Sequence, residues 1–196
     1  MFPAENYIRI SADPASGVSP FETTLKVDGS FTFASQTPTC TGPGSVQITN
    51  GTEENEFIVN LTTPGIYNFT STTQFEGQTY SDTVAAFVMD KEELDSLLQI
   101  KWNAMKELLI AGDIEKAIVY HQKAVHEKYT AIYNALGSEL PVLAQQMNEI
   151  SPVYFYDVLA KYRIRQDHDI NSQIKTITYY IYFSKDENGI WRIENY

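Results

Sequence analysis

The sequence changes character near residues 88–92, and this change constrains the fold more than any other feature. Before it, the chain is rich in Ser and Thr, is interrupted by Gly and Pro, and has two basic residues, Arg9 and Lys26. After it, the chain is rich in Lys, Tyr and Leu. Each part is long enough to bury a core of its own. The sequence therefore predicts two domains of different class, residues 1–89 and 90–196.

Acidic residues outnumber basic ones, and the formal net charge of the 196 residues is −11. Residues 1–90 hold ten acidic and two basic side chains, against fifteen and twelve in residues 91–196. Such a surface repels phosphate backbones, which argues against nucleic acid as a partner of the whole chain.

No stretch approaches the roughly 20 apolar residues of a membrane helix. Residues 1–5 lack the pattern of a signal peptide, and we interpret the chain as a piece of a larger protein.

The first part has the pattern of an all-β domain. Short runs with alternating or β-branched residues are separated by turn signals such as Asp28-Gly29 and Pro64-Gly65. Regular spacing of this kind predicts a β-sandwich. Cys40 is the one cysteine; it cannot form an intrachain disulfide, and its Pro- and Gly-rich surroundings predict a loop. The expected strands are residues 7–12, 23–27, 30–33, 45–49, 56–61, 66–73 and 82–89.

Three segments of this part resemble PKD-type immunoglobulin-like domains. Asp13–Pro20 resembles the opening of such a domain. The Pro-Gly-Ile-Tyr run at residues 64–67 and the later segment Gly77–Ser81 together resemble its closing hairpin. Cys40–Ser45 stands where many members have an Asp-rich loop, so no calcium site is carried over. The resemblance implies a spacer or binding module of extracellular bacterial proteins, located outside the cell or in the periplasm.

The second part begins with helical patterns. Asp90 is suited to cap a helix, with Glu93 three positions later. Apolar residues at helical spacing then follow to Gly112, and Trp102 is expected in the core. Further helical patterns start at Asp113, end at Gly137, and restart near Pro141. The residues expected on the first helical stripe are Leu94, Leu97, Leu98, Trp102, Met105, Leu108 and Leu109.

The period then changes to two, which predicts a strand or a bent pair of strands at residues 154–165, further strands at 172–183 and 190–195, and a turn at Asn188-Gly189. Helices followed by an antiparallel meander give an α+β domain. This order, and the ending Ile190-Trp191-Arg192-Ile193-Glu194, resemble NTF2-like domains, in which helices pack on a curved antiparallel sheet. That family includes both enzymes and structural partners, so the resemblance limits function only weakly.

Three cations alternate along one predicted strand. Lys161, Arg163 and Arg165 share one face of it, and an anion would be attracted if that face lined a concave pocket. A solvated sheet face explains the same pattern, with the long side chains covering apolar surface.

Tyrosines offer a second candidate site, because ten of the thirteen lie beyond residue 91. An aspartate–tyrosine pair in a pocket could transfer protons, whereas core aromatics and one loop carboxylate would be structural. His121 and His126 are five residues apart and do not share a helix face, while His168 is expected in a loop, so we expect no metal and no cofactor. The expected ligand residues are Lys161, Arg163, Arg165, Tyr162, Tyr180, Tyr182 and Asp157, with Tyr154 and Tyr156 as further wall residues.

No motif in either part specifies a reaction. We therefore expect a non-catalytic segment of an exported bacterial protein that acts as a spacer or as a binding module for other domains of its parent or for another protein. The alternative is an NTF2-like domain that binds a small anion, or acts as an enzyme, in a tyrosine-lined pocket.

Overall fold

The computed structural model describes residues 5–34 and 36–196, and it is mostly β, with 47% of residues in strands and 27% in helices. The chain divides into two compact units, Met1–Lys91 and Glu92–Tyr196, whereas the sequence placed the boundary after residue 89. The interpretation of the N-terminus as lacking a signal peptide falls almost entirely on residues 1–4, which lie outside the described residues. Each unit is described by itself.

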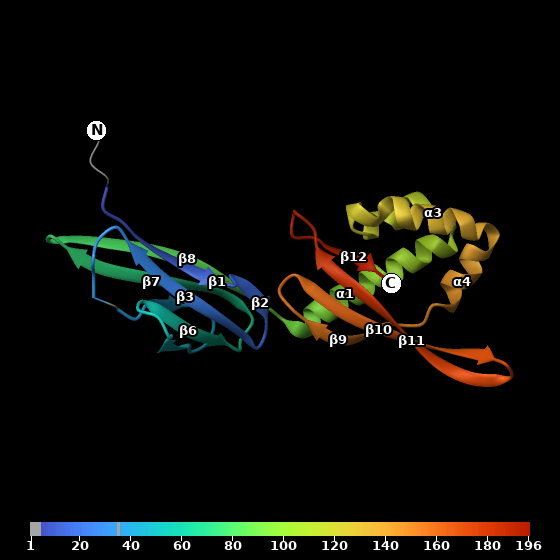
Figure 1. Cartoon of the computed structure of the whole chain (residues 1–196), viewed down its shortest axis with the longest axis horizontal. Coiled ribbons are helices and arrows are strands. Elements are labelled where there is room, and N and C mark those ends of the chain that lie inside the picture. Colours follow the sequence, from blue (N-terminus) through green and yellow to red (C-terminus); the bar gives the residue numbers. More distant parts are fainter. Residues whose placement is uncertain (1–4, 35) are drawn as a thin grey trace. The chain divides into compact units, whose positions relative to one another are not determined.

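Unit 1 is built from two four-stranded sheets (Figure 1). One sheet has the order β1-β3-β6-β5 and the other the order β2-β8-β7-β4. Neighbouring strands are antiparallel except β2 and β8, which run parallel. The strands are β1 (Ile8–Asp13), β2 (Ser16–Val18), β3 (Phe21–Gly29), β4 (Thr39–Thr41), β5 (Gln47–Asn50), β6 (Glu56–Leu61), β7 (Gly65–Phe75) and β8 (Gln78–Met89).

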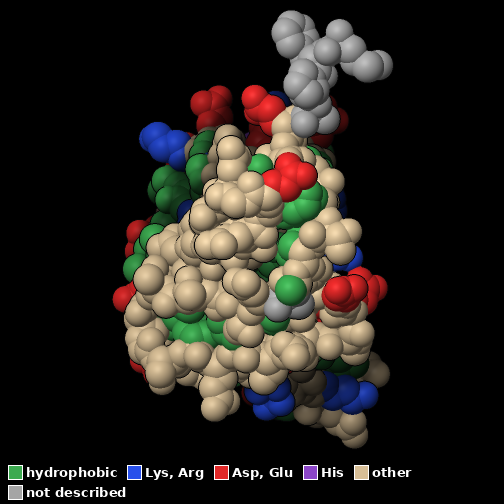
Figure 2. Space-filling view, turned by 90° about the vertical axis from the view of Figure 1, so that its left-hand side faces the viewer, with side chains coloured by type: hydrophobic (Ala, Val, Ile, Leu, Met, Phe, Trp, Pro, Cys, Tyr) green, Lys and Arg blue, Asp and Glu red, His purple; other side chains and the backbone are tan. Residues whose placement is uncertain are grey.

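The core of unit 1 follows from the alternation of its strands. Successive side chains of a strand point to opposite faces, so every second residue of β3, β6 and β7 enters the core. Leu25, Val59 and Phe69 are fully buried there. The end of unit 1 in Figure 2 is mainly uncharged polar side chains and backbone, with charged groups toward its margins. Charged side chains are thus few on this surface, in keeping with the twelve charged residues among residues 1–90.

Three local expectations for unit 1 were wrong. Residues 30–33 are not a strand, because Phe31 packs against Phe75 and Tyr80, with ring centroids 4.3 and 5.0 Å away. Cys40 lies in β4, paired with Phe69 of β7, rather than in a loop. The expected turn at residues 13–17 contains β2, which is too short for a periodicity to reveal. In each case contacts between distant segments override the local pattern.

The bend that enters β7 is fixed by a tyrosine. The ring of Tyr67 is buried, and its hydroxyl donates to the backbone oxygen of Thr63 at 2.7 Å. Gly65 between them has φ +139°, and a Cβ there would lie 2.7 Å from the Pro43 ring. The hydrogen bond and the glycine therefore hold this corner together.

The Tyr67 hydroxyl is expected to contribute to the stability of unit 1. The change Tyr67→Phe leaves the Thr63 carbonyl without its partner, which should lower the free energy of unfolding by about 1 kcal/mol. Urea denaturation of the full chain, followed through NMR signals of unit 1, measures this loss. Tyr80→Phe is the control, because the Tyr80 hydroxyl donates to the exposed Gln78 side chain rather than to a backbone carbonyl. Equal stability of Tyr67→Phe and the natural chain would contradict the structural role of this bond.

Unit 2 places its helices on one face of a four-stranded antiparallel meander (Figure 1). The sheet order is β12-β11-β10-β9, so neighbours in sequence are neighbours in space. The elements are α1 (Lys91–Ile110), α2 (Ile114–Ala117), the 3-10 turns η1 (Ile118–Tyr120), η2 (Lys123–Val125) and η3 (Gly137–Glu139), α3 (His126–Leu136), α4 (Leu140–Gln146), β9 (Ser151–Phe155), β10 (Leu159–Ile170), β11 (Gln173–Lys185) and β12 (Trp191–Asn195).

Helix α1 supplies much of the core of unit 2. It starts directly after Asp90 and ends before Gly112, whose φ is +73°. Trp102 is 1% exposed, which confirms its expected place in the core, but Leu97 is 42% exposed. The buried stripe is narrower than the apolar pattern, because α1 contacts the core with only one side. Its buried members are Leu94, Leu98, Trp102, Met105 and Leu109.

The β10–β11 hairpin is longer than the sequence indicates. The turn lies at Asn171 and Ser172, which have φ of +55° and +61°. Positive φ at both central residues is typical of the two-residue turn that matches the twist of its strands. His168 is therefore in a strand, opposite Lys175, and the expectation of a loop at residues 166–169 was wrong.

Candidate functional site

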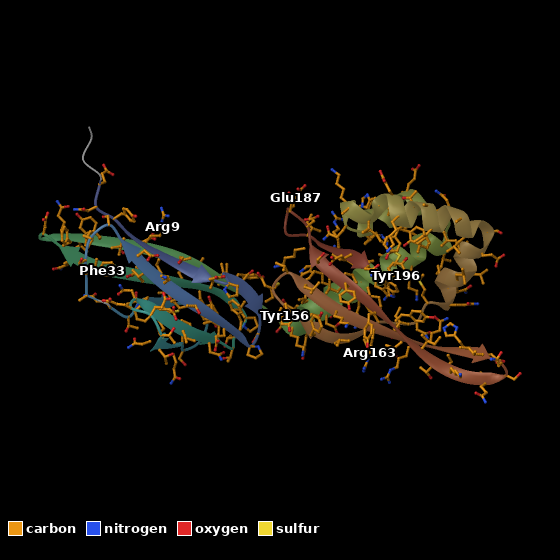
Figure 3. The ribbon with its side chains drawn as sticks, viewed as in Figure 1. Arg9, Phe33, Tyr156, Arg163, Glu187 and Tyr196 are labelled. Carbon is orange, nitrogen blue, oxygen red and sulfur yellow. The ribbon has the colours of Figure 1, made fainter. Side chains whose placement is uncertain are left out.

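The three predicted cations lie on the side of the sheet that faces away from the helices. Ala160, Tyr162 and Ile164 of β10 are buried. Of the cations between and after them, Lys161 and Arg163 are half-buried and Arg165 is exposed. The register pairs Lys161 with Tyr182 and Arg163 with Tyr180, so these tyrosines share the outer face. Figure 3 shows Arg163 pointing away from the helices. We call Tyr154, Lys161, Arg163, Arg165, Tyr180 and Tyr182 the cationic face.

Tyrosines surround the ammonium group of Lys161. Its Nζ lies 3.9 Å from the ring centroid of Tyr180, and 5.2 and 5.9 Å from those of Tyr182 and Tyr154. A cation over aromatic faces is attracted by their quadrupoles. The hydrogen bond with Tyr182 is the main cause that raises the pKa of Lys161 above its usual value. Lys161 is therefore held in place and charged at neutral pH.

The cations of this face are not neutralised by carboxylates. Among the described residues, the ion pairs do not include Lys161, Arg163 or Arg165. Acidic residues of the same strand begin with Asp167, whose carboxylate accepts a hydrogen bond from Thr176. In a chain of net charge −11, the cationic face is thus a local positive region with aromatic walls.

Two residues predicted for this site lie elsewhere. Tyr162 is fully buried on the inner face, where its hydroxyl donates to Oδ1 of Asp95 in α1 at 2.6 Å. Burial raises the pKa of Tyr162 far above its usual value. Asp157 lies 3.3 Å from Nζ of Lys185, whose register partner is Trp191 of the inner face. The expected set thus divides between two faces, because adjacent residues of a strand point in opposite directions.

Aromatic side chains occupy the space between helices and sheet. Tyr196, the last residue, lies between them in Figure 3, and its ring meets Trp102 edge-on at 5.3 Å. Its hydroxyl forms a short hydrogen bond with that of Tyr133. The backbone N–H of Tyr196 donates to the hydroxyl of Tyr129 at 2.9 Å. Trp102, Tyr129, Tyr133 and Tyr196 are therefore packed against one another on the inner side of the sheet, the side on which Tyr162 is buried.

His121 is a buried polar residue that contacts the rings of Tyr129, Tyr133 and Tyr196. It was not among the functional residues expected from the sequence. It is 1% exposed, and its Nε2 lies 3.0 Å from the Tyr133 hydroxyl. Burial lowers the pKa of His121 to about 4, against a smaller opposite effect of the Ala117 carbonyl. The imidazole is therefore neutral at pH 7. The signal in the sequence was the helical pattern that starts at Asp113, in which Ala117 and His121 fall on the same face. Both residues are buried in the structure.

The histidines do not form a metal centre. Nε2 of His126 lies 3.0 Å from the backbone oxygen of His121, so it is engaged with the backbone. Within residues 5–34 and 36–196, no group of three or more His, Cys, Asp or Glu side chains is arranged to hold a metal ion. In the same described residues, no helix is long and apolar enough to cross a membrane.

Comparison of the chain with protein-family models, with curated proteins and with solved structures found no match.

Proposed function

We propose that this chain is a non-catalytic segment of an exported bacterial protein, located outside the cell or in the periplasm. Unit 1 is an immunoglobulin-like spacer of the PKD type, and unit 2 is an NTF2-like domain that binds an acidic segment of another protein or of another domain of its parent. The cationic face of unit 2 is the observation that carries this proposal.

The immunoglobulin-like assignment is supported by strand order. In such sandwiches one sheet contains strands A, B, E and D, and the other contains C, F and G. The sheet β1-β3-β6-β5 matches the first order, and β4-β7-β8 matches the second. The bond from Tyr67 to Thr63 at the start of β7 matches the tyrosine corner of strand F. Strand β8 ends at Met89 and α1 begins at Lys91, so the two units are joined by a single residue. Such a short junction is compatible with a spacer role for unit 1.

The NTF2-like assignment is supported by the order and layering of unit 2. Its four helices precede the meander, and they lie on one face of the sheet (Figure 1). Between the helices and the sheet, Trp102, Tyr133 and Tyr196 contact one another and Trp102 and Tyr133 are buried. Binding at the outer face is therefore favoured over catalysis inside.

An acidic polypeptide fits the cationic face better than a compact anion does. Alternate residues of β10 are 6–7 Å apart, so Lys161, Arg163 and Arg165 form a row about 13 Å long. Such a row matches several carboxylates along an extended chain rather than one small group. The tyrosine rings beside it offer apolar area and hydroxyl groups to the same partner.

Titration of the 15N-labelled full chain with poly-L-glutamate tests this function. Amide signals of β10 and β11 around Arg163 should shift. The double variant Arg163→Ala, Arg165→Ala should weaken binding by up to about thirtyfold, since each lost pair contributes up to about 1 kcal/mol. The net charge of −11 repels a polyanion, so binding reports a local positive region. Inorganic phosphate tests the alternative of a small anionic ligand.

Lys128→Ala is the matched control, because Lys128 is an exposed cation on α3 and contacts Asn195. It should bind poly-L-glutamate as the natural chain does. Equal weakening by Lys128→Ala, or no shifts in β10 and β11, would contradict the proposed role of the cationic face.

A further inference from the structure

A second positive region lies in unit 2, in a cleft between α1, the segment α2–η1 and β12. It has a volume of about 560 Å³ and is lined by Lys101, Leu108, Lys116, Val119, Tyr120 and Arg192. None of these residues belongs to the cationic face, and sequence reasoning did not select any of them as a site. The cleft therefore requires an explanation of its own.

One part of the cleft wall is apolar. Leu108 and Tyr120 are half-buried, and Val119 is 54% exposed. Leu108 comes from α1, whose neighbouring Leu109 is buried in the core, and Val119 and Tyr120 come from η1, which directly follows the buried Ala117 of α2. A ligand with a hydrocarbon or aromatic body would remove this apolar area from water, which is favourable in proportion to the area covered.

The other part of the wall is positively charged. Nε of Arg192 lies 3.1 Å from Asp186, and the same guanidinium donates to the Val119 carbonyl at 2.6 Å. Lys116 forms a 2.6 Å ion pair with Asp113. These contacts fix two of the cations at the edge of the cleft and leave them partly neutralised.

Lys101 differs from Arg192 and Lys116 in its ion pairing. It is half-buried, and no ion pair within the described part of the chain includes it. Loss of solvation and the nearby charge of Arg192 lower its pKa, and the carboxylate of Asp186 opposes this only in part. A half-buried ammonium beside a second cation is unfavourable unless an anion joins them. Asp186 pairs with Arg192, whereas no ion pair among the described residues includes Lys101, so an anionic ligand beside Lys101 would stabilise its charged form.

We propose that this cleft binds a small organic carboxylate, with its charged group between Lys101 and Arg192 and its apolar body on Leu108, Val119 and Tyr120. The charged part of the cleft wall would contact the carboxylate of the ligand, and the apolar part would contact its hydrocarbon or aromatic body. Inorganic phosphate lacks the apolar body, and a neutral alcohol lacks the charge. This binding does not depend on the proposed function of the cationic face.

The test compares 4-phenylbutyrate with 4-phenyl-1-butanol, which has the same apolar body without the carboxylate. Titrations of the 15N-labelled full chain are expected to show that the acid shifts the amide signals of Lys101, Tyr120 and Arg192, and that the alcohol binds at least about tenfold more weakly. Lys101→Met keeps most of the apolar length of the side chain and removes its charge. It should weaken binding of the acid by about tenfold and leave binding of the alcohol unchanged.

Lys175→Met is the matched control, because Lys175 is an exposed lysine of β11 outside the cleft, and this variant should bind both compounds as the natural chain does. Far-UV circular dichroism checks that each variant is folded, and Lys101→Gln replaces Lys101→Met if the latter is not. Equal affinity for acid and alcohol, equal loss in Lys175→Met, or shifts confined to Lys161–Tyr182 would overturn the proposal. The last of these would place the carboxylate on the cationic face instead.

Discussion

Replacing Trp102 with alanine is expected to lower the free energy of unfolding of unit 2 by about 3–5 kcal/mol. The indole is 1% exposed, lies on the buried stripe of α1, and meets the ring of Tyr196 edge-on at 5.3 Å. Its removal leaves a cavity that the surrounding aromatic rings cannot fill without leaving their own positions. A loss of this size is a large fraction of the stability of an ordinary domain.

Fluorescence-detected urea denaturation measures this loss, because Trp191 remains as a reporter and both tryptophans belong to unit 2. Leu97→Ala is the control on the same helix; with 42% of its surface exposed, Leu97 should contribute much less, within about 1 kcal/mol. A Trp102→Ala variant as stable as Leu97→Ala would show that α1 does not pack on the sheet through this face.

Unit 2 should lose stability as the pH falls from 7 to 4. The pKa of His121 is about 4 in the folded chain and near 6.5 when unfolded, so between these values the unfolded state binds more protons. Stability therefore decreases as the pH falls through 6.5 and becomes constant for this group below pH 4. The difference between the two pKa values corresponds to roughly 3 kcal/mol in total.

The variant His121→Gln isolates this contribution from that of the carboxylates. Gln can still accept a hydrogen bond from Tyr133 but does not titrate, so the decrease between pH 6.5 and 4 should be smaller by roughly 3 kcal/mol. His168→Gln changes a histidine of the β10–β11 hairpin and should keep the full decrease. Identical pH profiles for the natural chain and His121→Gln would mean that the pKa of His121 does not differ between the folded and unfolded states.

Periodicity predicted those parts of the fold that depend on local pattern. The alternation in residues 56–61 matches β6, and helix α1 starts directly after Asp90, as the capping pattern indicates. The stripe through Trp102 predicted the buried side of that helix. The common face of Lys161, Arg163 and Arg165 also followed from sequence, because side chains two apart in a strand point the same way.

Tertiary structure decided what the local pattern leaves open. Alternation separates the two faces of β10 but does not say which one the helices cover, and this choice placed Tyr162 against Asp95 and left Lys161 among the outer tyrosines. The contact of Tyr196 with Trp102, and the cleft that Lys101 and Arg192 both line, join residues that are far apart in sequence. Such contacts form only when elements pack, so no spacing along the chain encodes them. Local pattern determined α1, β6 and the two faces of β10, whereas packing determined short strands such as β2 and β4 and decided which faces became core, cleft or surface.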